Sequence, residues 1–182
     1  MSATLILGGA RSGKSAYAEK LAAQSERQVV YIATARAGDA EMTARIAQHR
    51  SSRPQHWPTV EEPLHLADAI RYHSTPQNVI LVDCLTLWLS NLMFASGSAF
   101  PDVGTIILPV SFGEERAALL DALAHAPGDV VLVSNEVGMG IVPIGAVSRC
   151  FADEAGRLNQ AVAAVCERAL FIAAGLPLTL KG

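Results

Sequence analysis

The sequence predicts an α/β fold in which a mostly parallel central sheet carries helices on both faces. Short apolar runs alternate with longer segments of helical pattern, an order that favours parallel strands joined by crossover helices. The runs are nearly continuous in apolar residues, as expected of strands buried on both faces of a sheet. A length of 182 residues fits a single domain, residues 1–182, with its own core. The predicted strands are TLIL (4–7), VVYIATA (29–35), NVILVDCL (78–85), VVLVSN (130–135) and ALFIAA (169–174).

Helices are predicted in the segments that alternate with these strands. Pro54 marks the end of the helix over 39–52, because proline disfavours helical backbone in the residue before it. One further stretch, 96–112, fits neither pattern. Its turn residues surround the apolar TIIL at 105–108, so a long loop, an additional strand and a surface for a partner subunit are all open alternatives. The predicted helices are 14–24, 39–52, 63–72, 85–95, 113–126 and 146–167.

Composition narrows the class of protein. A net charge of −3 and an isoelectric point of about 5.9 give no bulk attraction for nucleic acid or an acidic membrane. The three cysteines, Cys84, Cys150 and Cys166, have neither paired nor metal-ligand spacing, which favours reduced thiols. The N-terminus lacks a signal-peptide pattern, and charged residues interrupt the longest apolar runs. We therefore expect a cytoplasmic protein without a membrane span.

The segment GGARSGKS directly follows the first predicted strand and opens the first predicted helix. It matches the phosphate-loop pattern G-x-x-x-x-G-K-[ST] at every position. Its glycines let successive N–H groups turn toward phosphate oxygens, and the helix N-terminus adds to the attraction. Lys14 is expected to reach the β- and γ-phosphates, and the Ser15 hydroxyl to bind Mg²⁺. The segment thus predicts a P-loop NTPase-like fold with nucleotide contacts from Gly8, Gly9, Ala10, Arg11, Ser12, Gly13, Lys14 and Ser15.

Asp83 closes the apolar run NVILVD, where many nucleotide-binding folds carry an acidic residue for the metal. It is therefore a candidate second Mg²⁺ ligand beside Ser15. An alternative role is to cap the helix that begins at the next residues, because aspartate is common at that position.

HRSSRP, residues 49–54, gathers a histidine and two arginines in one short segment. Neighbouring cations keep the imidazole of His49 neutral, with a lone pair available for nucleophilic attack. Arg50 and Arg53 can brace phosphate oxygens and neutralise the charge that develops during transfer. The alternative is a solvated helix C-terminus, where basic residues interact favourably with the negative end of the helix dipole.

The class of nucleotide-binding protein is narrowed by what the sequence lacks. Switch GTPases recognise guanine through an N-K-x-D segment, and none occurs here. A kinase of another small molecule is one alternative, with HRSSRP merely binding phosphate. A nucleotide-binding regulatory module that transfers no group is another.

Four segments together resemble the bifunctional adenosylcobinamide kinase / adenosylcobinamide-phosphate guanylyltransferase family. They are GGARSGKS (8–15), HRSSRPQHWPTVE (49–61), NEVGMGIVP (135–143) and GRLNQ (156–160). The resemblance implies phosphorylation of the aminopropanol hydroxyl of adenosylcobinamide by ATP or GTP. It then implies GMP transfer from GTP to adenosylcobinamide phosphate, through a histidine–GMP intermediate at His49. It also implies a homo-oligomer.

The same resemblance assigns further nucleotide contacts. Asp83 stands where some members carry glutamate, which keeps metal binding plausible there. Asn135 and Glu136 close a predicted strand, where α/β folds usually bind ligands. Asn159 and Gln160 either face the corrinoid or solvate a helix. The implied nucleotide contacts are Ala33, Thr34, Ala35, Arg50, Ser51, Ser52, Arg53, Glu61 and Asp83.

Overall fold

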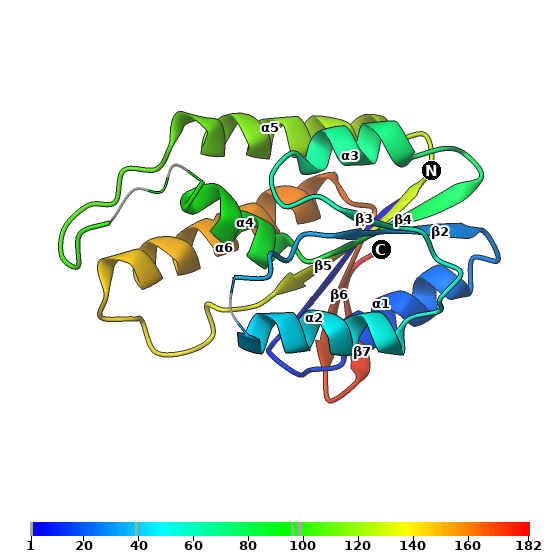
Figure 1. The fold of residues 1–182 in the computed structure, drawn as a ribbon, viewed down its shortest axis with the longest axis horizontal. Helices are drawn as coiled ribbons and strands as arrows, with labels where there is room; N and C mark the ends of the chain where they lie inside the picture. The colour runs from blue at the N-terminus through cyan, green and yellow to red at the C-terminus, as the bar shows by residue number, and fades with distance from the viewer. Residues whose placement is uncertain (1, 39, 96, 98–99) are drawn as a thin grey trace.

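A seven-stranded sheet runs through the part of the chain that the structure describes, in the order β3-β2-β4-β5-β1-β6-β7 (Figure 1). The computed structural model describes residues 2–38, 40–95, 97 and 100–182, without the side chains of residues 41, 45, 49 and 52. All neighbouring strands are parallel except β6 and β7. The strands are Ala3–Gly8 (β1), Gln28–Ala33 (β2), Thr59–Glu61 (β3), Asn78–Asp83 (β4), Asp129–Asn135 (β5), Arg168–Ala173 (β6) and Leu176–Lys181 (β7).

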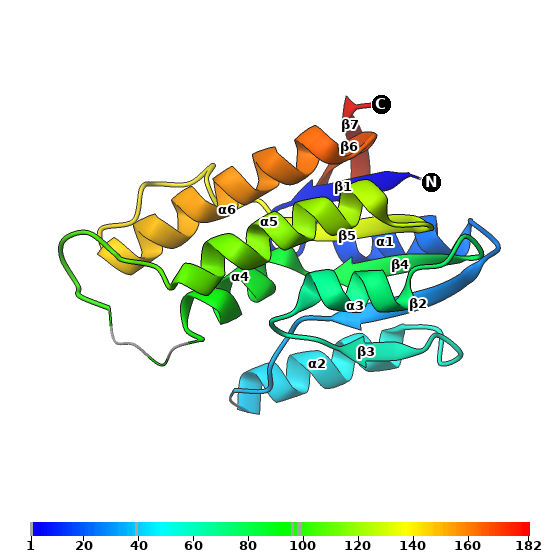
Figure 2. The same cartoon turned by 90° about the horizontal axis from the view of Figure 1, so that it is seen from above.

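Helices cover both faces of this sheet. Figure 1 shows α3, α4, α5 and α6 above the sheet and α1 and α2 below it; Figure 2 shows α2 near the edge formed by β3. A larger core cluster, which includes Trp88, lies between the upper helices and the strands, and a smaller one lies beneath the strands against α1. The helices are Lys14–Ala23 (α1), Ala40–Ser52 (α2), Leu66–His73 (α3), Leu85–Met93 (α4), Val110–His125 (α5) and Ala146–Val165 (α6).

This architecture confirms the predicted fold class. Every predicted apolar run overlaps a strand. Every residue of β1 is buried, which is why its sequence is apolar without alternation. Among the described helices, none is long and apolar enough to cross a membrane.

Two strands, β3 and β7, have no counterpart in the sequence prediction. β3 is only three residues long and largely exposed, so it leaves no apolar run. β7 is an exposed antiparallel edge strand that contains Pro177, a residue tolerated only at sheet edges. Ala174 and Gly175, both with positive φ, turn the chain between β6 and β7. That pair is not among the strong hairpin signals, which are Asn-Gly and Asp-Gly.

Two predicted strands also run two residues too far. β2 ends at Ala33 rather than at residue 35, and β4 ends at Asp83 rather than at residue 85. The chain leaves the sheet because Thr34 bonds to the next segment instead. Its Oγ1 accepts a hydrogen bond from Cys84 N at 2.9 Å and donates one to Cys84 O at 2.7 Å.

The undecided stretch 96–112 is mostly loop where the structure describes it. Residues 97 and 100–109 contain neither helix nor strand, and α5 begins at Val110, three residues before its predicted start. Residues 96, 98 and 99 lie outside the described part. The amide of Ala146 donates a hydrogen bond to Asp102 O at 3.2 Å, which ties this loop to the start of α6.

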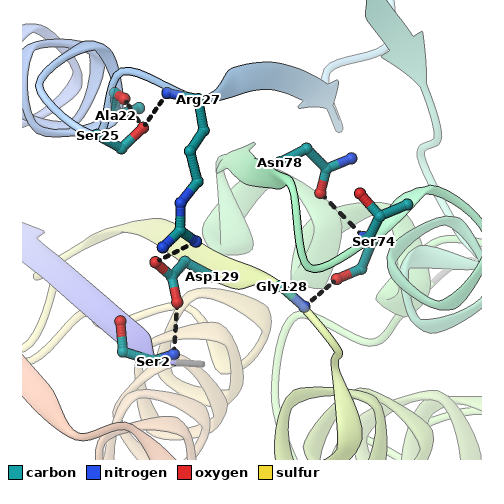
Figure 3. A network of polar contacts seen from close by, with 9 residues as sticks. Ser2, Ala22, Ser25, Arg27, Ser74, Asn78, Gly128 and Asp129 are labelled. Carbon is teal, nitrogen blue, oxygen red and sulfur yellow. Dashed lines mark hydrogen bonds and ion pairs between the residues drawn. The ribbon is translucent and has the colours of Figure 1, made fainter.

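Polar contacts close the amino-terminal edge of the sheet (Figure 3). Asp129 accepts hydrogen bonds from Ser2 N at 2.7 Å and from Arg27 Nη1 at 3.1 Å, joining the starts of three strands. Nearby, Gly128 N donates to Ser74 Oγ at 3.0 Å. The opposite, carboxyl-terminal edge is therefore the one left for a ligand site, as is usual in α/β folds.

Gly128 is expected to be sensitive to substitution because backbone atoms crowd it. A Cβ at this position would lie 2.2 Å from Thr75 O and 3.0 Å from Asn78 O. We expect Gly128→Ala to lower the free energy of unfolding by about 1–3 kcal/mol, as overpacking does. Gly113→Ala on α5 is the matched control, because nothing lies within 4 Å of its added Cβ. Urea unfolding measures both; an equal effect in the two variants contradicts the prediction.

Candidate active site

A cleft of about 1110 Å³ opens at the carboxyl ends of the strands. The ends of β2, β4 and β5 meet there, at Ala33, Asp83 and Asn135, and α2 faces the phosphate loop across it. Pockets for single small ligands are typically about 300–1,000 Å³, so this cleft has room for a nucleotide and part of a second substrate.

The phosphate loop joins β1 to α1 and depends on glycine at two positions. A Cβ on Gly8 would lie 2.5 Å from Ser12 Oγ and 2.6 Å from Ile172 O. Gly13 caps the N-terminus of α1 with φ of 91°, a conformation that favours glycine. Ser12 Oγ is buried and has no hydrogen-bond partner among the described residues. A loop with a spare buried hydroxyl and a free helix N-terminus fits a phosphate chain.

Lys14 is a buried cation on the wall of the cleft. Its Nζ donates a hydrogen bond to Gly9 O at 3.1 Å. Burial lowers the pKa of Lys14, and the neighbouring Cys84 and Asp83 oppose that shift. A positive charge held away from bulk water interacts strongly with the phosphate oxygens it meets.

Asp83 also borders the cleft, and its charge acts on Lys14. Its Oδ2 accepts a hydrogen bond from the Tyr31 hydroxyl at 3.0 Å. The residue at the N-cap of α4 is Cys84, and no side chain caps that helix, so the structure does not show the capping role considered for Asp83. Burial, and then the charge of Asp83, raise the pKa of Tyr31, which keeps the phenol protonated as a donor to the carboxylate.

Ser15 and Asp83 both border the cleft, as a shared metal site requires. Among the described residues, no group of three or more histidine, cysteine, aspartate or glutamate side chains could hold a metal ion. A hydroxyl and a carboxylate, as on Ser15 and Asp83, fit a cation such as Mg²⁺, which uses one or two protein oxygens and completes its shell with phosphate oxygens and water.

The segment HRSSRP, residues 49–54, reaches the same cleft from the end of α2. Arg53 is buried, and its guanidinium carbon lies 3.7 Å from the centre of the Tyr31 ring. Arg50 is more exposed and forms an ion pair with Glu61 at the end of β3. Both arginines line the cleft together with Lys14, although about forty residues separate them in sequence. His49 belongs to α2, but its side chain lies outside the described part of the structure.

The structure brings most of the predicted nucleotide contacts together. The side chain of Thr34 is fully buried and engaged with Cys84, and the exposed Ser51 hydroxyl donates to Gln48 O. The side chain of Ser52, like that of His49, lies outside the described part. Predicted residues on the cleft wall are Ala10, Arg11, Ser12, Gly13, Lys14, Ser15, Ala33, Ala35, Arg50, Arg53, Glu61 and Asp83.

Sequence reasoning missed Tyr31, which connects Asp83 to Arg53. Its one signal is a phenol in an otherwise apolar strand, VVYIATA. Sequence reasoning also missed the apolar side of the cleft, where Met42 and Ile46 lie four residues apart and so share one face of α2. These two side chains form an apolar part of the cleft wall.

The fold and the phosphate loop define the class: a P-loop nucleotide-binding α/β protein. Solved structures agree on the fold. The chain is similar to a type III secretion ATPase, with a TM-score of 0.57 at 14% identity, and it spans 56% of that longer chain. It is also similar to the flagellar accessory protein FlaH from Methanocaldococcus jannaschii, with a TM-score of 0.52 at 12% identity over 78% of that chain.

Closer relatives give the family. Residues 4–180 match the family model described as cobinamide kinase / cobinamide phosphate guanyltransferase. The chain is 54% identical to the bifunctional adenosylcobalamin biosynthesis protein CobP of Pseudomonas aeruginosa, over 98% of this chain and 96% of that one. It is 43% identical to the protein CobU of Escherichia coli K12, over 97% and 98% of the two chains. The chain therefore belongs to the cobinamide kinase / cobinamide phosphate guanyltransferase family, as the sequence analysis predicts.

Proposed function

We propose that this chain is a bifunctional transferase acting on adenosylcobinamide as a single catalytic domain. It phosphorylates the aminopropanol hydroxyl with ATP or GTP, and then transfers GMP from GTP to give adenosylcobinamide-GDP. The observation that carries the proposal is the shared cleft, where the phosphate loop faces the arginines of HRSSRP. Two transfers on one substrate need a loop that binds the triphosphate and a second group that binds phosphate. In this chain the phosphate loop and the two arginines line the same cleft.

The first step is an in-line phosphoryl transfer. The substrate hydroxyl oxygen attacks the γ-phosphorus, the bond to the β,γ-bridging oxygen breaks, and the nucleoside diphosphate leaves while the hydroxyl proton passes to solvent. Lys14 and the loop amides stabilise the charge on the phosphates. The buried position of Lys14 increases this effect, because fewer water molecules screen it.

The second step runs through His49. Its imidazole nitrogen attacks the α-phosphorus of GTP, and pyrophosphate leaves. A phosphate oxygen of adenosylcobinamide phosphate then attacks the same phosphorus, breaks the P–N bond and returns a neutral imidazole. Arg50 and Arg53 neutralise the phosphate oxygens during both displacements. The Tyr31 ring and Glu61 hold the two arginines at the cleft wall.

Ser15 and Asp83 are the residues proposed to hold Mg²⁺. When bound there, the ion neutralises phosphate charge and helps to orient the triphosphate. We expect Ser15→Ala and Asp83→Asn each to raise the Mg²⁺ concentration needed for half-maximal kinase activity by about tenfold. A Mg²⁺ titration of initial rate measures the shift. If Asp83→Asn instead lowers the melting temperature while its Mg²⁺ titration matches wild type, Asp83 has a purely structural role with Tyr31.

The proposed function is tested by chromatography of the products formed from adenosylcobinamide, GTP and Mg²⁺. Adenosylcobinamide-GDP is the expected end product. Phosphorylated substrate alone would indicate a kinase without the second activity, and no new corrinoid product would favour a kinase of another molecule or a regulatory module. We further propose that the protein is cytoplasmic, in keeping with its three free cysteines. We also propose that it forms a homo-oligomer, in keeping with the family resemblance.

A further inference from the structure

A small polar cluster lies at the end of β5, on the wall of the nucleotide cleft. Asn135 Nδ2 donates a hydrogen bond to Thr86 Oγ1 at 2.5 Å and lies 3.8 Å from Cys84 Sγ. Cys84 Sγ in turn lies 3.2 Å from Thr86 Oγ1. Asn135 and Cys84 border the cleft beside Lys14 and Asp83. The cluster therefore fixes the donor end of the Asn135 amide against α4.

A second pair of side chains holds Asn135 from behind. Asn159 on α6 and Ser134 on β5 are both buried, and Ser134 Oγ donates to Asn159 Oδ1 at 2.7 Å. Asn159 Nδ2 reaches Asn135 O at 3.4 Å. Asn159 is thus neither a corrinoid contact nor a solvated helix residue, the two roles considered for it from sequence, whereas its neighbour Gln160 is exposed.

The backbone of Asn135 is also attached to the phosphate loop. Gly8, the first residue of that loop, is the register partner of Asn135 across β1 and β5. The next amide, Glu136 N, donates to Gly8 O at 3.0 Å. The Asn135 side chain therefore keeps a set position relative to the loop that receives the triphosphate.

One polar atom of this arrangement has no hydrogen-bond partner among the described residues. Asn135 Oδ1 accepts no hydrogen bond from the residues that the structure describes, while Nδ2 is committed to Thr86. An amide oxygen cannot donate to phosphate, but it can accept a hydrogen bond from a hydroxyl group. A carbonyl acceptor held beside the lysine that meets the γ-phosphate suits the hydroxyl group that attacks this phosphate.

We propose that Asn135 binds the acceptor hydroxyl in the phosphoryl-transfer step, with Oδ1 accepting its hydrogen bond and directing an oxygen lone pair at the γ-phosphorus. Thr86 and Asn159 are positioning residues that act through Asn135. This inference rests on the proposed kinase function. Asn135 takes no proton: the O–P bond forms, the bond to the bridging oxygen breaks, and the proton leaves to solvent.

The test separates the two chemical steps. With ATP and adenosylcobinamide, Asn135→Leu, which keeps the size but removes the acceptor, should reduce kcat about 10²-fold, the scale of a misoriented nucleophile. The KM for ATP should change less than about threefold, because the ground-state contacts to the nucleotide remain. Thr86→Val should reduce kcat by about tenfold, because the amide remains but is no longer held. Label from GTP carrying ³²P at the α-phosphate should stay on denatured Asn135→Leu, since adduct formation involves no acceptor hydroxyl.

The control is Gln77→Ala, an exposed amide residue just before β4 at the opposite edge of the sheet from the cleft, which should match wild type in both assays. Thermal melting establishes that each variant is folded. If Asn135→Leu is unfolded, the kcat of Thr86→Val tests the inference in its place. A normal kcat in folded Asn135→Leu overturns the inference, as does a raised KM for ATP or a lost adduct, since either means that Asn135 shapes the nucleotide site. Absence of phosphorylated product with the wild-type enzyme instead overturns the proposed function, and this inference with it.

Discussion

His49→Asn should abolish the GMP adduct and adenosylcobinamide-GDP while the enzyme still converts adenosylcobinamide to its phosphate. Guanylyl transfer through the enzyme needs a nucleophile at residue 49, and phosphoryl transfer to a substrate hydroxyl needs none. Asparagine keeps a similar size and some hydrogen bonding but forms no stable phosphoramidate. Removing a nucleophile commonly reduces such a step by about 10⁶-fold, so the adduct should fall below detection.

The measurement combines two readouts on the same variant. Protein is mixed with GTP labelled at the α-phosphate, denatured and counted, with acid lability identifying a phosphoramidate. Corrinoid products are separated in parallel. His56→Asn is the matched control, because His56 is an exposed histidine only seven residues away, in the loop after α2.

Two results would contradict this assignment. Label on His49→Asn equal to wild type moves the nucleophile to another residue. Loss of both activities in a folded His49→Asn means that the imidazole maintains the shape of the shared cleft instead.

A structural feature of this protein can be predicted from its sequence when the residues that determine it lie within one short segment. β1 and β4 are predictable because strands buried on both faces require continuous apolar runs. The phosphate loop is predictable for a similar reason: Gly8 and Gly13 are required by steric crowding and a positive φ within one short segment. β3 and β7 leave no such signal, because short or exposed edge strands need no apolar pattern.

The parts of the site that sequence does not predict are contacts between distant segments. Tyr31 joins Asp83 and Arg53, each more than twenty residues away. Asn135 meets Thr86 across 49 positions of sequence. Such pairs form because β2, β4 and β5 end at the same edge of the sheet, and strand order is a property of the whole chain. The individual roles of the site residues, that of His49 above all, stay predictions.

The buried charge of Lys14 leads to the other large expected effect. Lys14→Ala should reduce phosphoryl transfer by about 10²–10³-fold, the usual loss when one preorganised electrostatic stabiliser is removed. Lys20→Ala, an exposed lysine on the same helix, should leave the rate unchanged. Initial rates with adenosylcobinamide, ATP and Mg²⁺ measure both variants.

The melting temperature of Lys14→Ala should not follow its kinase rate, and this difference separates a role in catalysis from a role in folding. Burial lowers the pKa of Lys14 in the folded state, so between the folded and unfolded pKa values the unfolded chain binds more protons. The charged lysine therefore opposes folding below that window, and the penalty disappears as pH rises through it. At neutral pH, Lys14→Ala removes the penalty, so its melting temperature should not fall, whereas its kinase rate does. A variant that loses rate and melting temperature together would show that Lys14 holds the loop in shape through Gly9, and near-normal turnover in a folded Lys14→Ala would remove the phosphate loop from the chemistry.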